Sequence, residues 1–550
     1  MSENAVALAT DHVFPTLTSA QIARIAPHGR RRAVAKGDLL VEVGQRPIPF
    51  FVVLSGEMQV LRPTGEVIVT HGAGQFTGEG TMLNGRRSLA RARVSVSGEV
   101  IELDRAELLG LIQKDAELSE ILMRAFLLRR VKLIANDFGD VVMIGSTHCA
   151  GTLRIREFLT RNGHPFHYVD LDRDAEAQEL LDRFHVTAAD VPVLICRGDA
   201  LLRNPTNQQI ADCLGFNDAV DRAQVRDVII VGAGPAGLAA AVYGASEGLD
   251  VLVLEANVPG GQAGSSSRIE NYLGFPTGIS GLDLTGRAYA QAQKFGAQVL
   301  VAKGAMKLTC AHPLYSVHLD DGTRIDARAL VIASGAEYRK PAITNVSRFE
   351  GAGVYYAASR MESQLCIGEE VAIVGGGNSA GQAAVFLAET AGRVHILVRK
   401  DGLAETMSRY LVRRIEDHPK IVLRTRTELV ALEGERHLDR VQWRDGRTGA
   451  LETHDIRHTF MMTGAVPNTG WLGGCVALDS RGFIKTGPDL SQEDLRMAGW
   501  PLARPPYLLE TSRPGMFAVG DVRGGNIKRC AAAVGEGSIA IAFVHQVLHQ

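Results

Sequence analysis

The stretch VIIVGAGPAG, residues 228–237, decides the fold of this 550-residue chain. A run of β-branched residues ends there in the pattern G-x-G-x-x-G. An alanine-rich helix is predicted over residues 238–248, and a second buried strand over residues 249–255. Glu255 closes that strand, where a ribose hydroxyl would need an acceptor. A glycine turn alone can be purely structural, but one with both flanking strands and this acid predicts a dinucleotide site.

Each glycine of the turn has a distinct expected role. Gly232 makes the turn, Gly234 lets the backbone approach a pyrophosphate, and Gly237 lets the helix pack closely on the strand. Pro235 and Ala236 lie between these glycines and belong to the same candidate site. The N-terminus of the following helix offers free N–H groups and a positive dipole end, both of which favour phosphate.

Composition excludes several classes of protein. The chain has 59 Lys and Arg against 61 Asp and Glu, so its near-neutral charge favours neither nucleic acid nor an anionic membrane. No apolar run approaches the ~18 residues of a membrane span, and residues 1–14 show no signal-peptide pattern. The seven cysteines are scattered without a C-x-x-C pair, which is typical of a reducing cytoplasm rather than a disulfide scaffold. We therefore expect a cytoplasmic protein with no membrane span, nucleic-acid partner or metal site.

Residues 34–104 combine short apolar strands with closely spaced glycines, which predicts a barrel or sandwich. Helices are predicted over residues 105–132, and no helix-turn-helix follows them, so a transcription factor is not expected. The segment resembles the cyclic-nucleotide-binding domain of catabolite-activator-type regulators and cyclic-nucleotide-dependent kinases. The residues that carry the resemblance are, in order, Gly37-Asp38, Gly44, Leu54-Ser55-Gly56 and Phe76-Thr77-Gly78-Glu79.

This resemblance implies a regulatory site for cAMP or cGMP. In that family a Gly-Glu pair, here Gly78 and Glu79, starts a short helix that meets the cyclic phosphate and the ribose 2′-hydroxyl. A downstream arginine pairs with the phosphate, and by position it is Arg87 or its neighbour Arg86, followed by Ser88. The spacing from Glu79 to Arg87 is one residue shorter than usual in the family. A degenerate roll used for packing or dimerisation is therefore the alternative.

From residue 141 the pattern changes to alternating short strands and helices. Strands are predicted over residues 141–145, 166–170 and 191–195, and helices over 152–162, 175–184 and 208–214. This order resembles the glutaredoxin/thioredoxin fold, in which the first helix opens with the redox motif and a cis-proline precedes the third strand. Here the motif position holds CAGT, residues 149–152, and Pro192 occupies the proline position.

Cys149 thus lacks the second thiol of a C-x-x-C pair. A helix N-terminus would lower its pKa, which makes Cys149 a candidate catalytic thiolate. The alternative is an inert cysteine in a docking domain. The charged linker over residues 217–226 then indicates a boundary before the dinucleotide strand.

Beyond Glu255, the segments PGGQAG (259–264) and IENYLGFP (269–276) resemble those of the low-molecular-weight thioredoxin reductases. The resemblance covers residues 227–550 and implies FAD as cofactor. In that family the positions of Gly261, Gln262 and Asn271 line the isoalloxazine. Gly335 stands in the small-residue turn where the chain crosses to a second domain.

The C-terminal stretch GMFAVGD, residues 515–521, is a further signature of that family. It implies that Asp521, after Gly520, hydrogen-bonds the ribityl chain. Arg529, Cys530 and Ala531 align with the segment that opens the last helix, whose backbone N–H groups reach the flavin pyrimidine.

A second dinucleotide turn lies in VAIVGGGNSA, residues 371–380. The next strand, residues 393–398, ends in Arg399 and Lys400 rather than in an acid, which favours the 2′-phosphate of NADPH over NADH. The family usually has a further arginine that falls here on Ala404, with Arg409 nearby. The candidate NADPH residues of the turn are Gly375, Gly377, Asn378, Ser379 and Ala380.

The dithiol of the thioredoxin reductases is missing. Their C-x-x-C falls on Ala357 and Arg360 in the segment YYAASR, residues 355–360, and Cys366 is close but unpaired. Without a dithiol, the flavin has no route to a protein disulfide by the family's thiol exchange.

These patterns predict a multidomain chain with a β-roll, a small thioredoxin-like α/β domain and two Rossmann-like domains. The expected boundaries are 1–135 for the roll and its helices, 138–216 for the thioredoxin-like domain, 227–343 and 464–550 for the two parts of the FAD domain, and 344–463 for the NADPH domain. As in relatives of this fold, we expect a homodimer.

The main functional hypothesis is an NADPH-dependent FAD oxidoreductase gated by the N-terminal roll, with a small protein, a quinone or oxygen as electron acceptor. The alternatives are a flavin-based redox and cyclic-nucleotide sensor with little turnover, or a ferredoxin, quinone or oxygen reductase.

Overall fold

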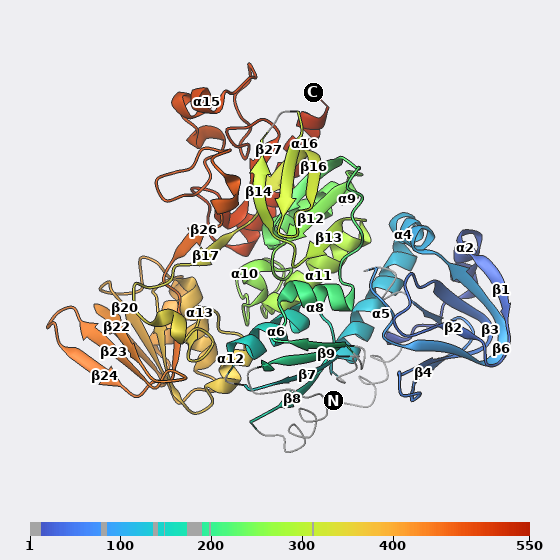
Figure 1. Cartoon of the computed structure of the whole chain (residues 1–550), viewed down its shortest axis with the longest axis horizontal. Helices are drawn as coiled ribbons and strands as arrows, with labels where there is room; N and C mark the ends of the chain where they lie inside the picture. Colours follow the sequence, from blue (N-terminus) through green and yellow to red (C-terminus); the bar gives the residue numbers. More distant parts are fainter. Residues whose placement is uncertain are drawn as a thin grey trace.

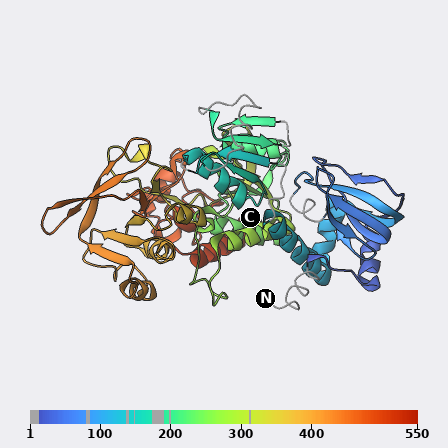
Figure 2. The same cartoon turned by 90° about the horizontal axis from the view of Figure 1, so that it is seen from below.

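A computed structural model describes residues 13–78, 85–135, 141–147, 149–172, 190–196, 200–310 and 313–549 of the chain (Figure 1). The N-terminal β-roll, with strands β1 to β6, lies at one end of the molecule in both views. A domain with a five-stranded sheet (β18 to β21 and β25) lies at the other end, and a domain with a seven-stranded sheet (β11 to β16 and β27) lies between them (Figure 2). The predicted multidomain organisation is therefore visible as separate sheets. The roll and the five-stranded domain have cores of their own, whereas one apolar cluster runs from the small domain into the seven-stranded domain.

The N-terminal roll is a six-stranded antiparallel sheet in the order β1-β6-β3-β4, with β2 on β6 and β5 on β3. Its core joins Phe50 and Phe76 of the sheet to Leu108 of the helix that follows. The predicted short strands and the helices after them are present, whereas the long strand β6 was not among the predicted strands. The elements are α2 (Ser19–Ile25), β1 (Arg30–Val34), β2 (Leu39–Val41), β3 (Phe50–Leu61), β4 (Val67–His71), β5 (Phe76–Thr77), β6 (Arg91–Leu103), α4 (Arg105–Lys114) and α5 (Ala116–Ala135).

His71, the last residue of β4, makes the stability of the roll sensitive to acid. Its side chain is 1% exposed, its ring lies 5.9 Å from that of Phe14, and its Nδ1 has no hydrogen-bond partner among the described residues. Burial, assisted by nearby Arg129, lowers the pKa of His71 to about 3. Because the unfolded chain protonates near the ordinary value, stability is lost as pH falls below that value toward the folded pKa.

We expect acidification to pH 5 to lower the free energy of unfolding of the roll by roughly 2 kcal/mol through this histidine. Each pH unit below 6.5 lowers it by about 1.4 kcal/mol. His71→Phe should remove that loss. The measurement is hydrogen exchange of β3 and β6 at pH 7.5 and pH 5, corrected for intrinsic exchange. Equal acid sensitivity in both proteins would contradict the prediction.

A small domain follows, with a four-stranded sheet in the order β10-β9-β7-β8. β7 and β8 are parallel, whereas β9 is antiparallel to both β7 and β10, and the Val191–Pro192 peptide is cis. The predicted helix over 175–184 lies outside the described residues, and β10 had no counterpart among the predicted strands. The elements are β7 (Val141–Gly145), α6 (Ala150–Arg161), β8 (His167–Asp170), β9 (Val193–Cys196), β10 (Ala200–Arg203) and α8 (Asn207–Leu214).

The first parallel-sheet domain has seven strands in the order β13-β12-β11-β16-β15-β14, with β27 beside β16. The strands β13, β12, β11, β16 and β27 are parallel, whereas β15 and β14 extend the sheet as antiparallel strands. Its strands β11 and β12 are the two predicted on either side of the first glycine turn, and they are parallel. β12 is fully buried, and so is β11 except for Asp227. The elements are β11 (Arg226–Val231), α9 (Pro235–Ser246), β12 (Val251–Glu255), α10 (Gly261–Gly264), α11 (Gly281–Lys294), β13 (Gln298–Val301), β14 (Ala305–Thr309), β15 (Tyr315–Leu319), β16 (Arg324–Ile332), α15 (Gln492–Ala498), β27 (Met516–Ala518) and α16 (Cys530–Leu548).

Among the described residues, α16 is the one helix long and apolar enough to cross a membrane by length and composition. It packs against α9 so closely that a Cβ atom on Gly537 would overlap the carbonyl oxygen of Ala236. Ala540, Ile541 and Val544 of α16 belong to the core of the same domain. We therefore regard α16 as a core helix, whose apolar length the search for uninterrupted apolar runs overlooked.

The second parallel-sheet domain has five parallel strands in the order β18-β25-β19-β20-β21, and a three-stranded antiparallel sheet, β22-β23-β24, packs beside it. The two chain crossings between the parallel-sheet domains, β17 and β26, pair with each other. The elements are β17 (Ala336–Tyr338), β18 (Val354–Tyr355), α12 (Arg360–Leu365), β19 (Glu370–Val374), α13 (Asn378–Leu387), β20 (Arg393–Val398), α14 (Arg409–Glu416), β21 (Ile421–Thr425), β22 (Thr427–Glu433), β23 (Arg440–Asp445), β24 (Leu451–His454), β25 (His458–Met461) and β26 (Ala465–Pro467).

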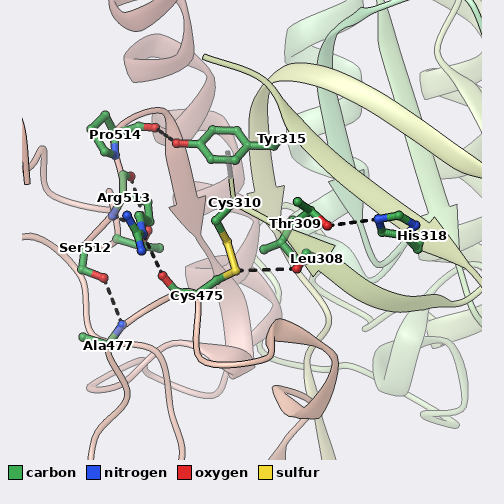
Figure 3. Close-up of a disulfide and its surroundings, with 11 residues drawn as sticks. Leu308, Thr309, Cys310, Tyr315, His318, Cys475, Ala477, Ser512, Arg513 and Pro514 are labelled. Carbon is green, nitrogen blue, oxygen red and sulfur yellow. Dashed lines mark hydrogen bonds between the residues drawn. A yellow bond between two sulfur atoms is a disulfide. The ribbon is translucent and has the colours of Figure 1, made fainter. Parts of the chain in front are cut away.

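A disulfide joins Cys310, just after β14, to Cys475, which follows the second crossing (Figure 3). The two residues are 165 positions apart in the chain, and their Cα atoms lie 6.1 Å apart. This pair corrects the expectation, drawn from cysteine spacing, that the thiols stay separate. The spacing could not show it because the return of the chain from the second domain brings the two segments together.

Candidate dinucleotide site

A cavity of about 1460 Å³ lies between the two parallel-sheet domains and is lined by both glycine turns. It brings together nearly all the candidate cofactor residues, although they are dispersed over three hundred positions of sequence. Two of the candidates, Gly237 and Ala531, do not line it. Those that do are Gly232, Gly234, Pro235, Ala236, Glu255, Gly261, Gln262, Asn271, Gly335, Gly375, Gly377, Asn378, Ser379, Ala380, Arg399, Lys400, Gly520, Asp521, Arg529 and Cys530.

The first glycine turn has the geometry of a nucleotide cradle. Gly232 has a φ of +106°, which disfavours any residue with a side chain. A Cβ atom on Gly237 would overlap the carbonyl oxygen of Gly232, so this glycine serves helix–strand packing and lies behind the cavity. A Cβ atom on Gly234 would meet nothing nearer than the Cα of Gly261, at 3.9 Å, so this backbone is open to a ligand.

Glu255 is buried at the cavity wall and holds the turn in place. Its carboxylate accepts hydrogen bonds from the backbone N–H groups of Ala233 at 2.8 Å and Asn257 at 2.9 Å. Burial raises the pKa of Glu255, and these donors together with nearby Arg161 oppose that rise. The sequence pattern assigned Glu255 to a ribose hydroxyl and missed this second role in fixing the turn.

Another part of the cavity wall is built around the start of α16. Arg529 is the N-cap of this helix and Cys530 its first residue, so the helix begins at the cavity with free backbone N–H groups. Burial raises the pKa of Asp521, against the opposing influence of Lys528. Burial also raises the pKa of the Cys530 thiol, assisted by Asp521, so this thiol stays neutral.

Gln262 joins the cavity wall to the crossing between domains, because its side-chain amide donates to the backbone carbonyl of Ala336 in β17. Its side chain thus already has a protein partner at the position where the sequence suggested a flavin contact.

The second glycine turn repeats the same construction in the second domain. Gly375 has a φ of +149°, and a Cβ atom there would overlap the carbonyl oxygen of Met462. A Cβ atom on Gly377 would meet nothing within 4 Å. Arg399 and Lys400 are exposed at the end of β20, where Lys400 pairs with Glu405 at 2.9 Å. Arg399 makes no ion pair within the part of the chain that the structure describes.

The segment that corresponds to the missing dithiol holds no reactive thiol. Ser359 caps α12, and Cys366 at the other end of this helix is fully buried. Its thiol donates to the carbonyl oxygen of Glu362 at 3.1 Å, and burial raises its pKa well above the ordinary value. A neutral buried thiol is a poor nucleophile, so Cys366 does not replace the dithiol.

Cys149 lies at the N-cap of α6, half-buried, and outside the dinucleotide cavity. The ring of cis-Pro192 packs against the same motif, since a Cβ atom on Gly151 would lie 3.0 Å from its Cδ. The structure therefore brings the proline to the CAGT segment but does not bring Cys149 to the cavity.

The candidate cyclic-nucleotide residues lie at a seam between the roll and the small domain. Arg86 is buried, donates to the carbonyl oxygen of Asn162 at 2.8 Å, and stacks 4.1 Å from the ring of Phe216. Arg87 lies beside Gly215, and the Ser88 hydroxyl donates to the carbonyl oxygen of Ala90 at 2.7 Å.

Two further candidates complete this site. Gly78 has a φ of +97°, whereas Glu79 lies outside the described residues. The sequence placed the arginines on a phosphate, whereas in the structure Arg86 is engaged by the neighbouring domain.

The sequence also missed Arg161, the last residue of α6. It belongs to the small domain, yet it lines the cavity between the two parallel-sheet domains. No motif surrounds it, so only the tertiary structure could reveal it.

Comparison with known proteins identifies relatives of both large regions. A family model described as pyridine nucleotide-disulphide oxidoreductase matches residues 226–537, and a cyclic nucleotide-binding domain model matches residues 31–115. The thioredoxin reductase of Bacillus subtilis is 31% identical over 329 residues, covering 60% of this chain and 96% of the relative. That of Treponema pallidum is 33% identical over 316 residues, covering 57% and 94%.

Solved structures agree. The thioredoxin reductase of Lactococcus lactis aligns with a TM-score of 0.53 and 25% identity, over 59% of this chain and 100% of its own. That of T. acidophilum aligns with a TM-score of 0.53 and 27% identity, over 60% and 100%.

Proposed function

Since this chain belongs to the pyridine nucleotide-disulphide oxidoreductase family, we propose that it is an NADPH-dependent FAD oxidoreductase of the thioredoxin-reductase-like class. The observation that carries the proposal is one cavity lined by both glycine turns. We call the seven-stranded domain the FAD domain and the five-stranded domain the NADPH domain. The test is anaerobic addition of NADPH to the FAD-loaded protein, which should bleach the flavin absorbance.

The residues present fit FAD. The open backbone at Gly234 and the N-terminus of α9 suit a pyrophosphate, and buried Glu255 suits a ribose. Asp521 and the start of α16 line the same cavity, which supports roles for them at the ribityl chain and the flavin pyrimidine. Bound FAD would supply two-electron transfer between NADPH and an acceptor, and the protein's part is to position both nucleotides and exclude water.

Arg399 supports a preference for NADPH. It lines the cavity at the end of β20 and is exposed, so its guanidinium can pair with a 2′-phosphate. We expect Arg399→Gln to raise the KM for NADPH about tenfold and to leave the KM for NADH unchanged. The tenfold change corresponds to the loss of one charge-assisted hydrogen bond to the 2′-phosphate.

Steady-state kinetics with both nucleotides tests this preference. Arg440→Gln is the matched control, because Arg440 of β23 pairs with Glu433 of β22 and does not line the cavity. An equal rise in both KM values for Arg399→Gln would contradict the assignment.

Electrons would not reach the acceptor through a dithiol beside the flavin, because the corresponding segment holds no reactive thiol. We propose a small protein, a quinone or oxygen as acceptor. The strand order of the small domain and cis-Pro192 beside CAGT support a thioredoxin-like domain, whose Cys149 is a candidate monothiol relay. A panel of acceptors assayed with wild type and Cys149→Ser separates these routes. Unchanged turnover with every acceptor would remove the relay.

The roll supports regulation by cAMP or cGMP. Asp218, just after the small domain, pairs with Arg46 of the roll and with Arg105 of α4 at 3.3 Å, and it lies beside Gly85, the residue before Arg86. A cyclic phosphate that engaged Arg86 would compete with the contacts of Arg86 to Asn162 and Phe216 and so change the arrangement of the domains. Calorimetry with both nucleotides tests it, and flat titrations would reject ligand gating.

A further inference from the structure

Helix α6 of the small domain lies between the FAD and NADPH domains, close to α10 on one side and α12 on the other (Figure 1). Near its N-terminus, Leu153 packs in the core of the NADPH domain with Tyr355 and Cys366. Ala150 lies so close to Gly351 that a Cβ atom on this glycine would overlap it. The other end of the helix reaches the FAD domain through its last residue, Arg161.

The Arg161 guanidinium lies against α10. Its Nη2 donates to the carbonyl oxygens of Gly261 at 2.5 Å and Pro259 at 3.2 Å. A Cβ atom on Gly264 would lie 2.8 Å from the same nitrogen. Nη1 pairs with Glu157 at 2.9 Å, one turn earlier on α6. These contacts fix the plane of the guanidinium at the cavity wall.

Part of the Arg161 side chain faces the cavity. The side chain is 10% exposed and lines the cavity, whereas its Nε is buried and has no hydrogen-bond partner among the described residues. Nε is closed to solvent in this arrangement, so an occupant of the cavity would meet the exposed part of the side chain. A guanidinium keeps its positive charge at any ordinary pH, so that part attracts an anionic occupant.

The nature of the occupant follows from the neighbours. Gly261, whose carbonyl binds Arg161, approaches Gly234 so closely that a Cβ atom on Gly261 would lie 3.0 Å from the Cα of Gly234. Gly234 is the N-cap of α9, where backbone N–H groups favour an anion. The guanidinium and the helix N-terminus therefore present positive charge to the same part of the cavity.

We propose that Arg161 is an FAD-positioning residue supplied by the small domain, and that it binds the anionic pyrophosphate part of the cofactor. This inference rests on the proposed function, because it takes FAD as the occupant. It makes the small domain part of the FAD site. FAD binding and docking of α6 between the two nucleotide domains then support each other.

The test is FAD affinity of the full-length chain after removal of bound flavin, followed by flavin fluorescence. We expect Arg161→Gln to weaken FAD binding about ten- to hundredfold, the value of a charge-assisted hydrogen bond to phosphate. The FAD affinity of Arg161→Lys should fall between those of wild type and Arg161→Gln, since lysine keeps the charge but lacks the planar guanidinium. Arg156→Gln is the matched control on the same helix, because Arg156 stacks on Tyr168 within the small domain.

The outcomes separate the two levels of the proposal. Wild type that binds no FAD would reject the proposed function itself. Wild type that binds FAD, with Arg161→Gln binding as tightly as Arg156→Gln, would overturn the role of Arg161 alone.

A measurement on wild type covers the case in which Arg161→Gln does not fold. Hydrogen exchange along α6 should slow when FAD is added to the flavin-free chain, and exchange unchanged by FAD would overturn the inference.

Discussion

Gly237→Val is expected to yield a protein that retains no FAD. The valine Cβ would overlap the carbonyl oxygen of Gly232, so α9 must move away from β11 and the turn must open. Overpacking against rigid backbone costs about 3 kcal/mol or more, which corresponds to at least about a hundredfold loss of affinity if only the FAD-binding conformation bears it. The flavin content of the purified variant, by absorbance, is the measurement.

Gly286→Ala is the control for this change. Gly286 lies in α11 of the same domain, and a Cβ atom there would meet nothing within 4 Å. Because Gly286 occupies an exposed position of this helix, alanine there should stabilise the domain by about 1 kcal/mol and leave the flavin content unchanged. A yellow Gly237→Val protein with the flavin content of this control would show that the close packing of α9 on β11 does not hold the FAD site.

Gly375→Val is expected to leave the flavin bound but unable to be reduced by NADPH. Gly375 has a φ of +149°, and a Cβ atom there would overlap the carbonyl oxygen of Met462. A valine side chain would therefore distort the turn between β19 and α13. This turn belongs to the NADPH domain, which has its own core, so the FAD domain should stay folded. We expect the observed rate of flavin reduction by NADPH to fall about a hundredfold or more, from a clash of about 3 kcal/mol.

Anaerobic stopped-flow reduction of the FAD-loaded variant measures this effect, with chemical reduction by dithionite as the control for an intact flavin. Reduction by NADPH at the wild-type rate would mean that the second glycine turn does not hold the nicotinamide nucleotide. Together, the two variants assign each turn to its own nucleotide.

Most of the fold could be predicted from local sequence patterns. The glycine turns at residues 232–237 and 375–380 were found because short-range sterics dictate them, and each lies between the expected strand and helix. The strands β2, β3 and β4 of the roll and the order β7, α6, β8, β9 were likewise predicted from changes of periodicity, whereas β1 and β6 were not. The family model over residues 226–537 agrees with the signatures that the resemblance used.

Long-range contacts were not accessible in the same way. The seam at Arg86 and the reach of Arg161 into the cavity join different domains, and the Cys310–Cys475 disulfide joins the two sequence parts of one domain. Residue type and spacing do not predict such contacts, because they form only when segments far apart in the chain are brought together by the fold. The second role of Glu255 was missed for a related reason, since a carboxylate that holds its own turn looks in sequence like one that awaits a ribose.

The central claim is that both nucleotides bind in one cavity and exchange electrons there. Anaerobic titration of the FAD-loaded chain with NADPH tests it most directly. We predict loss of the visible flavin absorbance at about one equivalent of NADPH, the stoichiometry of a two-electron donor and a two-electron cofactor. Flavin absorbance unchanged in excess NADPH, in a preparation that dithionite does reduce, would contradict it.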